Sequence, residues 1–216
     1  MNHDMQLKQA VLAELSWEPS IAAAHIGVTA ENGIVSLSGH VESFLEKQAA
    51  ETAVRRVKGV KGLAEEIEVR LPFRVKRGDD EIAAAAVSRL GWNTSLPTDA
   101  VKVKVEKGWV TLTGQVDWHY QSDAAANDVR SLHGVVGISN RITLKPRVDT
   151  TKLSDNIRTA LHRSWFFDPK TISVHADGGK VRLTGTAASW YERDVAGMTA
   201  WAAPGATSVE NNISIN

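Results

Sequence analysis

The chain has 216 residues, with 25 basic and 25 acidic side chains and no cysteine. A formal net charge of zero argues against a dedicated nucleic-acid-binding protein, which usually carries a large basic excess. The absence of cysteine excludes disulfides, zinc–thiolate sites, iron–sulfur clusters and thiol nucleophiles.

The sequence shows no targeting or membrane-spanning segment. The first residues contain no basic region followed by an apolar run, so they do not look like a signal peptide. No stretch approaches the ~20 apolar residues that a transmembrane helix needs. We therefore expect a cytoplasmic protein if Met1 is the native start.

The first predicted elements are a helix and a β-hairpin. Leu7, Val11 and Leu15 recur every four residues, which is typical of one face of a helix. Along residues 26–41, apolar side chains occupy every second position on both sides of a turn that contains glycine. This alternation predicts two antiparallel strands joined by a tight turn.

A second helix and a third strand complete the unit. The helix is expected from about Ser43 to Lys58, with Gly59 as its C-terminal cap, and the strand includes Ile67. The order is therefore αββαβ. Apolar side chains of the second strand point to one side only, which predicts an α+β two-layer sandwich with two helices on one face of a small mixed three-stranded sheet.

This unit occurs three times without an internal gap. Adding 75 to a residue number gives the equivalent position in the second copy, and adding 146 gives the position in the third. We therefore expect domains at 4–72, 79–146 and 150–216, with linkers at about 72–78 and 146–150. Three sets of glycines are expected to be structural, namely Gly33, Gly108 and Gly179 in the turns, Gly39, Gly114 and Gly185 near the strand ends, and Gly59, Gly134 and Gly205 after the second helices.

The strand-end glycine is on the same side of its strand as the core residues. We infer that either a helix crosses closely at Gly39 or the strand bends there.

Each copy resembles a BON domain (bacterial OsmY and nodulation). The pattern is Ile/Val-x-Val, then Gly-x-Val-x-Leu-[Ser/Thr]-Gly-x-Val, an alanine-rich helix, Gly-Val and a final Asn/Glu-x-Ile strand, and it covers 26–69, 101–144 and 172–215. The third copy departs from the pattern at Ala187 and at 204–206. With three copies and no export signal, the chain is similar to leaderless triple-BON proteins of Gram-negative bacteria.

The resemblance implies a binding module linked to osmotic or envelope stress, and not an enzyme. Some members of the family bind anionic phospholipids. The familiar members are periplasmic or lipoprotein-anchored, so the resemblance implies a periplasmic location if a leader has been removed from this chain.

No motif in the sequence predicts a catalytic residue, a cofactor or a metal. The seven histidines lack HExxH or paired spacing, and no nucleophile elbow or Walker lysine motif is present. Carboxylate pairs such as Glu65-Glu66 and Asp79-Asp80 are adjacent in sequence, and we interpret them as solvated.

Seven tryptophans are the unusual feature of the composition. Trp17 and Trp92 are equivalent, just after the first helix, and Phe44 and Trp190 are equivalent at the start of the second helix, with Trp118 one position earlier. One interpretation is that these rings close the ends of small cores or the contacts between units. The other is an amphipathic rim for lipid headgroups or for a partner surface.

Trp109 differs from the other tryptophans because alternation places it on the outer face of the sheet, beside Thr111. A core position is harder to reconcile with that face. Packing against a neighbouring unit is the alternative.

Basic residues form three loose groups. Arg55, Arg56 and Lys58 close the second helix of the first copy, Lys76 and Arg77 lie in the first linker, and Lys102, Lys104 and Lys107 share the outer face of the second hairpin. They are either solvated side chains, favourable at a helix C-terminus, or attractors of anionic headgroups at roughly 1 kcal/mol each.

Two functional hypotheses follow. In the first, the chain binds anionic phospholipid through a surface formed by Phe44, Arg55, Arg56, Lys58, Trp109, Trp118 and Trp190. In the second, it is a soluble protein–protein interaction scaffold or a self-associating stress protein. A contiguous exposed patch at Trp118 and Trp190 favours the first hypothesis, and burial of most tryptophans between units favours the second.

Overall fold

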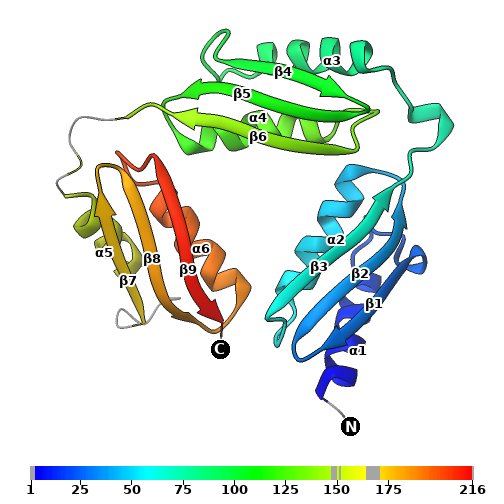
Figure 1. Ribbon diagram of the computed structural model, residues 1–216, viewed down its shortest axis with the longest axis horizontal. Helices are drawn as coiled ribbons and strands as arrows, with labels where there is room; N and C mark the ends of the chain where they lie inside the picture. Colours follow the sequence, from blue (N-terminus) through cyan, green and yellow to red (C-terminus); the bar gives the residue numbers. More distant parts are fainter. Residues whose placement is uncertain (1–2, 147–149, 151, 164–170, 216) are drawn as a thin grey trace. The chain divides into compact units, whose positions relative to one another are not determined.

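All three repeats adopt the predicted αββαβ order in the computed structural model, which describes residues 3–146, 150, 152–163 and 171–215 (Figure 1). The first repeat consists of α1 (His3–Trp17), the 3-10 turn η1 (Ala23–His25), β1 (Ile26–Glu31), β2 (Ile34–Val41), α2 (Phe44–Arg56) and β3 (Gly62–Val69). A second 3-10 turn, η2 (Phe73–Val75), lies in the first linker.

The other two repeats follow the same plan. The second consists of α3 (Asp79–Trp92), β4 (Val101–Glu106), β5 (Trp109–Val116), α4 (His119–Arg130) and β6 (Gly137–Leu144). The third consists of α5 (Leu153–His162), β7 (Ile172–Asp177), β8 (Lys180–Ala187), α6 (Trp190–Trp201) and β9 (Ser208–Ile215). None of the described helices is long and apolar enough to cross a membrane.

The second strand of the unit is the centre of each three-stranded sheet, with orders β1-β2-β3, β4-β5-β6 and β7-β8-β9. In the first and third repeats the hairpin strands are antiparallel, and the last strand pairs parallel to the central one. The parallel pairing requires a crossover, and the second helix provides it. The sheets are therefore mixed, as predicted.

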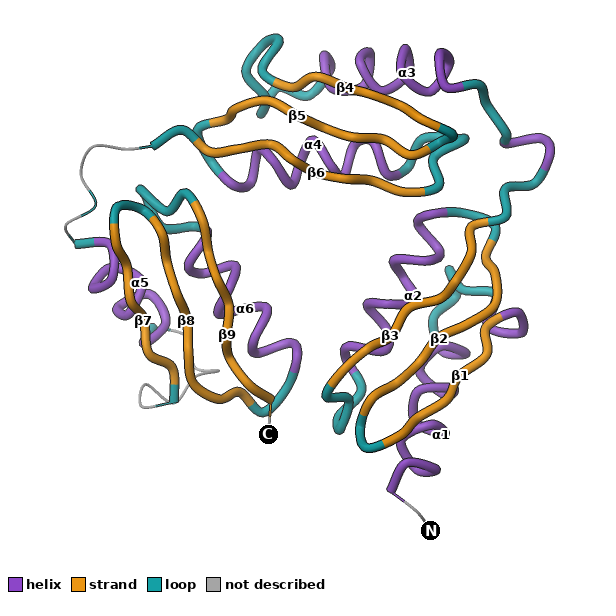
Figure 2. The backbone as a smooth tube through the Cα atoms, in the orientation of Figure 1, coloured by secondary structure: helices purple, strands orange, loops and turns teal. Residues whose placement is uncertain are grey.

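The helices of each repeat lie against one face of its sheet (Figure 2). In the first repeat, Val35 and Leu37 of β2 are fully buried under the helices, while the intervening Ser36 is on the partly solvated face. Val11 and Leu15 provide the buried stripe of α1. The third repeat repeats this arrangement with its own buried cluster. Alternation along the strands and a four-residue period along the helices thus define one small core per repeat.

The hairpin turns have the left-handed backbone that the asparagine and glycine predicted. Asn32 and Gly33 have φ values of 53° and 83°, as the two central residues of a type I′ turn require. In the second repeat a lysine, Lys107, takes the first of these positions with a φ of 52°. Asp79, the first residue of α3, accepts hydrogen bonds from the N–H groups of Lys107 (2.7 Å) and Gly108 (2.8 Å), and so ties the helix to the turn.

Of the two explanations expected for the strand-end glycines, a close helix crossing and a bend in the strand, the first does not hold at Gly39. No helix crosses at Gly39; a Cβ there would collide with the carbonyl oxygen of His25, which immediately precedes the paired strand β1. Gly39 has a φ of 112°, outside the extended region that side chains favour.

The second helix ends earlier than expected. α2 stops at Arg56, so Gly59 is not its cap but part of the following turn, with a φ of 95°.

Candidate functional site

The two most exposed tryptophans lie at the same place in two repeats. Trp17 ends α1 with 84% of its surface exposed, and Trp92 ends α3 with 83% exposed. The interpretation of these two rings as plugs of small cores is therefore wrong. A position two residues beyond the last buried residue, Leu15 or Leu90, is about 200° around a helix, so each ring points away from the core.

A hollow of about 690 Å³ opens beside Trp92 in the second repeat. It is lined by side chains of α3, including Arg89, and by Asp128 and Leu132 at the end of α4. Asp128 accepts a 2.6 Å hydrogen bond from Nδ2 of Asn93 and lies 3.7 Å from the Arg89 guanidinium. The hollow is thus a polar-edged groove between two helices, with an exposed indole at its rim.

The aromatic residues at the start of the second helices are only partly buried. Trp118 takes the N-cap position that Ser43 and Ser189 occupy in the other repeats, and its N–H donates to Oε1 of Gln121. The Trp190 ring lies under the guanidinium of Arg193, 5.0 Å from the ring centre. Exposed apolar side chains occupy one equivalent position near the start of the second helix in all three repeats, namely Leu45, Tyr120 and Tyr191. Phe44 is partly buried.

Trp109 packs on its own sheet. Its indole Nε1 donates to Oγ of Ser139 at 2.9 Å, and the ring covers Gly137, where any Cβ would collide with it. About half of the side chain (47%) remains exposed. Its position on the outer face agrees with the alternation, and the glycine beneath it is what makes room for the ring.

The protein–protein interaction hypothesis expected most tryptophans to be buried, and the described ones are not. None of the six described tryptophans is buried, and the remaining one, Trp165, lies outside the described residues. Trp118 and Trp190 are each partly covered. The exposed indoles are instead those of the first helices.

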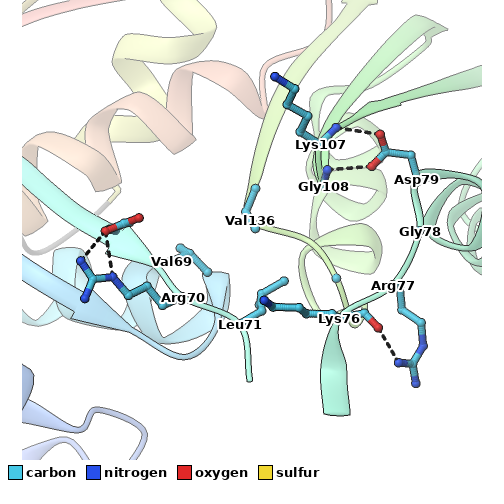
Figure 3. Close-up of a pocket in the computed structure, with 12 residues that line it drawn as sticks. Val69, Arg70, Leu71, Lys76, Arg77, Gly78, Asp79, Lys107, Gly108 and Val136 are labelled. Carbon is cyan, nitrogen blue, oxygen red and sulfur yellow. Dashed lines mark hydrogen bonds and ion pairs between the residues drawn. The ribbon is translucent and has the colours of Figure 1, made fainter. Parts of the chain in front are cut away.

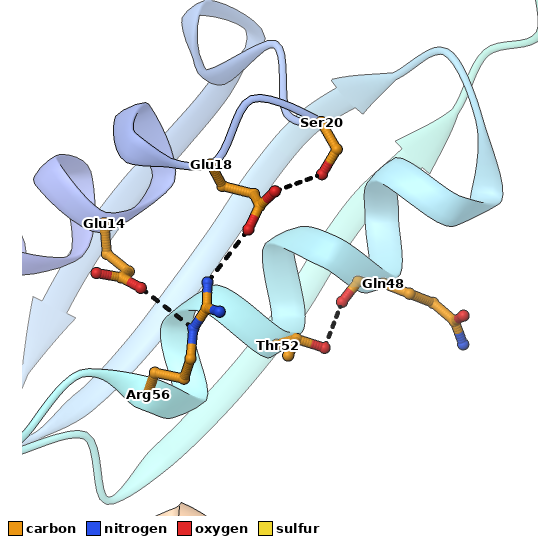
Figure 4. Close-up of polar contacts among 6 residues, drawn as sticks. All are labelled: Glu14, Glu18, Ser20, Gln48, Thr52 and Arg56. Atoms are coloured by element: carbon orange, nitrogen blue, oxygen red, sulfur yellow. Dashed lines mark hydrogen bonds and ion pairs between the residues drawn. The ribbon is translucent and has the colours of Figure 1, made fainter.

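The predicted basic group at the end of α2 is partly neutralised (Figure 4). Nε of Arg56 lies 3.1 Å from Glu14, and its Nη2 lies 3.3 Å from Glu18. Hydrogen bonds from Ser20 and then from Arg56 lower the pKa of Glu18. Arg56 therefore joins α2 to the chain at the end of α1, while Arg55 and Lys58 are exposed.

Buried or paired carboxylates have structural roles. Glu46 is buried at the third position of α2 and accepts from the N–H groups of Ala22 (2.7 Å) and Glu42 (2.9 Å). Glu65 forms a 2.8 Å ion pair with Lys47, which also donates to the carbonyl oxygen of Ile67. Within the described residues, no group of three or more His, Asp or Glu side chains is placed to hold a metal ion.

The first linker contains a feature that the sequence interpretation missed. Phe73 is 92% exposed, and Arg74, Lys76 and Arg77 beside it are exposed as well. Only Lys76 and Arg77 had been singled out, as a loose basic pair. The signal available in the sequence was an aromatic residue between cations in a segment with no strand or helix partner to bury it.

Comparisons with known proteins identify the same three repeats. The BON domain family model matches residues 3–70, 78–146 and 149–216. The chain is similar to "Osmotically-inducible protein Y" of Escherichia coli (strain K12), with 30% identity over 146 residues, which cover 66% of this chain and 73% of that protein. It is also similar to the "21 kDa hemolysin" of Actinobacillus pleuropneumoniae, with 33% identity over 138 residues, which cover 61% and 69% of the two chains.

Among solved structures, the C-terminal domain of CdsD, a structural protein of the type III secretion system of Chlamydia trachomatis, aligns over the full length of both chains. Its identity is 15% and its TM-score 0.28, too low to support a functional argument. The family model, in contrast, covers almost every residue in three consecutive matches. The chain belongs to the BON domain family, of which it contains three tandem copies.

Proposed function

We propose that the chain is a non-catalytic binding module of osmotic or envelope stress that attaches to anionic phospholipid surfaces. The observation that carries the proposal is the matched exposure of Trp17 and Trp92 at the ends of α1 and α3. Indole rings favour the membrane–water interface, where the apolar ring contacts acyl chains and the N–H meets water or headgroups. Two such rings at equivalent positions offer two contacts of the same kind.

Other features support a binding role and not a catalytic one. The family is non-enzymatic, and two relatives are named for osmotic induction and for haemolysis. The carboxylates that the fold brings into contact with other groups, such as Glu46 and Asp79, bind backbone N–H groups of caps and turns.

The test is co-flotation of the full chain with anionic or neutral vesicles, with tryptophan emission recorded in parallel. We expect flotation with anionic vesicles only, reduced by salt, together with a blue shift. The double variant W17S/W92S should lose most of the blue shift and much of the flotation. V87S is the matched control, because Val87 is also exposed on α3, five residues before Trp92.

Absence of flotation at both low and moderate salt would overturn this proposal. The second hypothesis, a protein–protein interaction module, would then replace it.

A further inference from the structure

The first linker presents an apolar side chain that nothing in its own segment covers. Phe73 begins the 3-10 turn η2, and its 92% exposure is the highest among the large apolar side chains that the structure describes. An exposed phenyl ring has no polar group to offset its contact with water. It is therefore a candidate for insertion into an apolar phase or a partner.

Three cations without carboxylate partners follow this residue within four positions of the sequence. Arg74, Lys76 and Arg77 are all exposed, and within the described part of the chain none of them forms an ion pair. The Arg77 guanidinium donates only to backbone carbonyl oxygens, those of Arg74 (3.2 Å) and Lys76 (2.8 Å). By contrast, Lys47 and Arg56 in the folded repeat are each paired with glutamate. The linker cations thus keep their charge available to an external anion.

The segment is ordered by its own backbone contacts. Val75 donates to the carbonyl of Pro72 at 3.0 Å and Lys76 to that of Phe73 at 3.3 Å, which closes the turn. At its end, Arg77 packs closely on Gly134 of the second repeat, with its Cβ 2.9 Å from where a glycine Cβ would lie. A preformed turn loses less conformational entropy on binding than a flexible one does.

The carboxylates that follow the linker are mostly engaged. Figure 3 shows Asp79 directed at the N–H groups of Lys107 and Gly108, away from Lys76. Glu81 accepts from the N–H of Gly78 at 2.9 Å. Asp80 is the exposed carboxylate left in this turn of the helix, against three linker cations. The local balance of available charge is therefore positive.

From this arrangement we infer that the first linker is a further element that contacts an anionic lipid surface beside Trp17 and Trp92, with Phe73 inserted among the acyl chains and Arg74, Lys76 and Arg77 on the phosphates. An anionic membrane interface binds such a segment in two ways, since the apolar side chain is buried among acyl chains and the cations are attracted to the headgroups. The inference rests on the proposed function and adds to it a segment outside the three folded repeats. It differs from the sequence-based surface at the end of α2, where Arg56 is held by two glutamates.

The experiment measures partitioning of the full chain onto vesicles of phosphatidylglycerol and phosphatidylethanolamine, with phosphatidylcholine vesicles as the neutral reference. The variants are F73S and R74Q/K76Q; Arg77 is left intact because it packs on Gly134. R55Q/K58Q is the matched control, since it removes the same charge from the exposed end of α2. Thermal unfolding of each variant confirms that the fold is kept.

We expect F73S and R74Q/K76Q each to weaken partitioning about tenfold, with R55Q/K58Q within about twofold of the wild type. Wild-type flotation that is unchanged in both linker variants, or lost only in W17S/W92S, would overturn this inference and leave the proposed function standing. Failure of the wild type to float on anionic vesicles would overturn both.

Discussion

In the first and second repeats, a charged side chain of the second helix reaches two equivalent positions at the end of the first helix, but the sign of its charge differs. In the first repeat the cation Arg56 of α2 reaches Glu14 and Glu18 at the end of α1. In the second repeat the anion Asp128 of α4 reaches Arg89 and Asn93 at the end of α3. The equivalents of Glu14 and Glu18 are Arg89 and Asn93, so the charge at the first of these positions is inverted.

The third repeat has neither of these two polar contacts at the positions of Glu14 and Arg56. The equivalents of Glu14 and Arg56 there are Ala160 and Ala202, so no such pair joins α5 to α6 at these two positions. The backbone of the unit is thus constant while the surface between its helices varies freely. A surface ion pair contributes little to stability, which is why its sign can change between repeats without changing the fold.

The largest loss of stability should come from replacing the strand-end glycine that the two repeats share. In G114A, the new Cβ would collide with the carbonyl oxygen of Ala100, and Gly114 has a φ of 141°. Strain and overpacking together should cost at least about 3 kcal/mol of unfolding free energy. G39A should do the same in the first repeat. Urea unfolding with hydrogen exchange would show which repeat is lost.

The matched control for this prediction is G91A. Gly91 lies in α3 with nothing within 4 Å of its Cβ position, so alanine should stabilise the helix by about 0.5–1 kcal/mol. A G114A chain as stable as the wild type would show that the strand end can move away from the neighbouring backbone.

The next effect tests the inverted contact. D128A removes the acceptor of the 2.6 Å bond from Asn93 and the partner of Arg89, and should cost about 1–2 kcal/mol because a partly buried polar group loses its partner. R56A should cost less, since Arg56 is half exposed. Chemical denaturation of both variants measures the difference. N93A combined with D128A should be clearly non-additive, and additive losses would show that the two residues do not act together.

Periodicity explains how much of this fold the sequence could predict. The stripe of Leu7, Val11 and Leu15 and the alternation along the hairpins define the elements, the covered face of each sheet and the three repeats. The order of the strands required the structure, because alternation says which face is buried and not which strand is central. The reason for a glycine at position 39 could not be predicted either, because a close backbone contact between strands leaves no pattern in the side-chain types.

The candidate site was harder to predict, although part of the signal was present. Trp17 lies two residues after Leu15, and that spacing alone places it on the opposite side of the helix. Phe73 was overlooked because a linker has no periodicity to interpret. The engagement of Arg56 by Glu14 and Glu18 could not be foreseen, because it depends on how two helices far apart in the sequence cross.

A smaller effect concerns the hairpin turns. The first repeat has Asn32 where the second has Lys107, and both have positive φ. Because asparagine tolerates this conformation better than lysine, K107N should stabilise the second repeat by about 0.5–1 kcal/mol. Asp79 accepts its two hydrogen bonds from backbone N–H groups of this turn, so a change of side chain leaves them in place. Calorimetry would detect the gain; K104N, in the adjoining strand, should show none, and a gain there of equal size would remove the turn as its cause.

The smallest effect comes from a carboxylate that the other repeats lack. Glu51 of α2 is half-buried, and its equivalents are Ala126 and Gly197. Burial, and then repulsion from Glu65, raise the pKa of Glu51. A carboxyl whose folded pKa is raised destabilises the fold above that pKa and ceases to do so once the pH falls below its ordinary pKa of about 4.3.

E51Q should therefore raise the melting temperature at pH 7, and the gain should shrink as the pH falls, disappearing near pH 4. Thermal unfolding across this range measures it, with the exposed Glu31 changed in E31Q as the control. A gain that persists unchanged at pH 3 would assign it to packing of the amide instead of to removal of the charge. The first repeat would then keep a carboxylate at this position for reasons unrelated to Glu65.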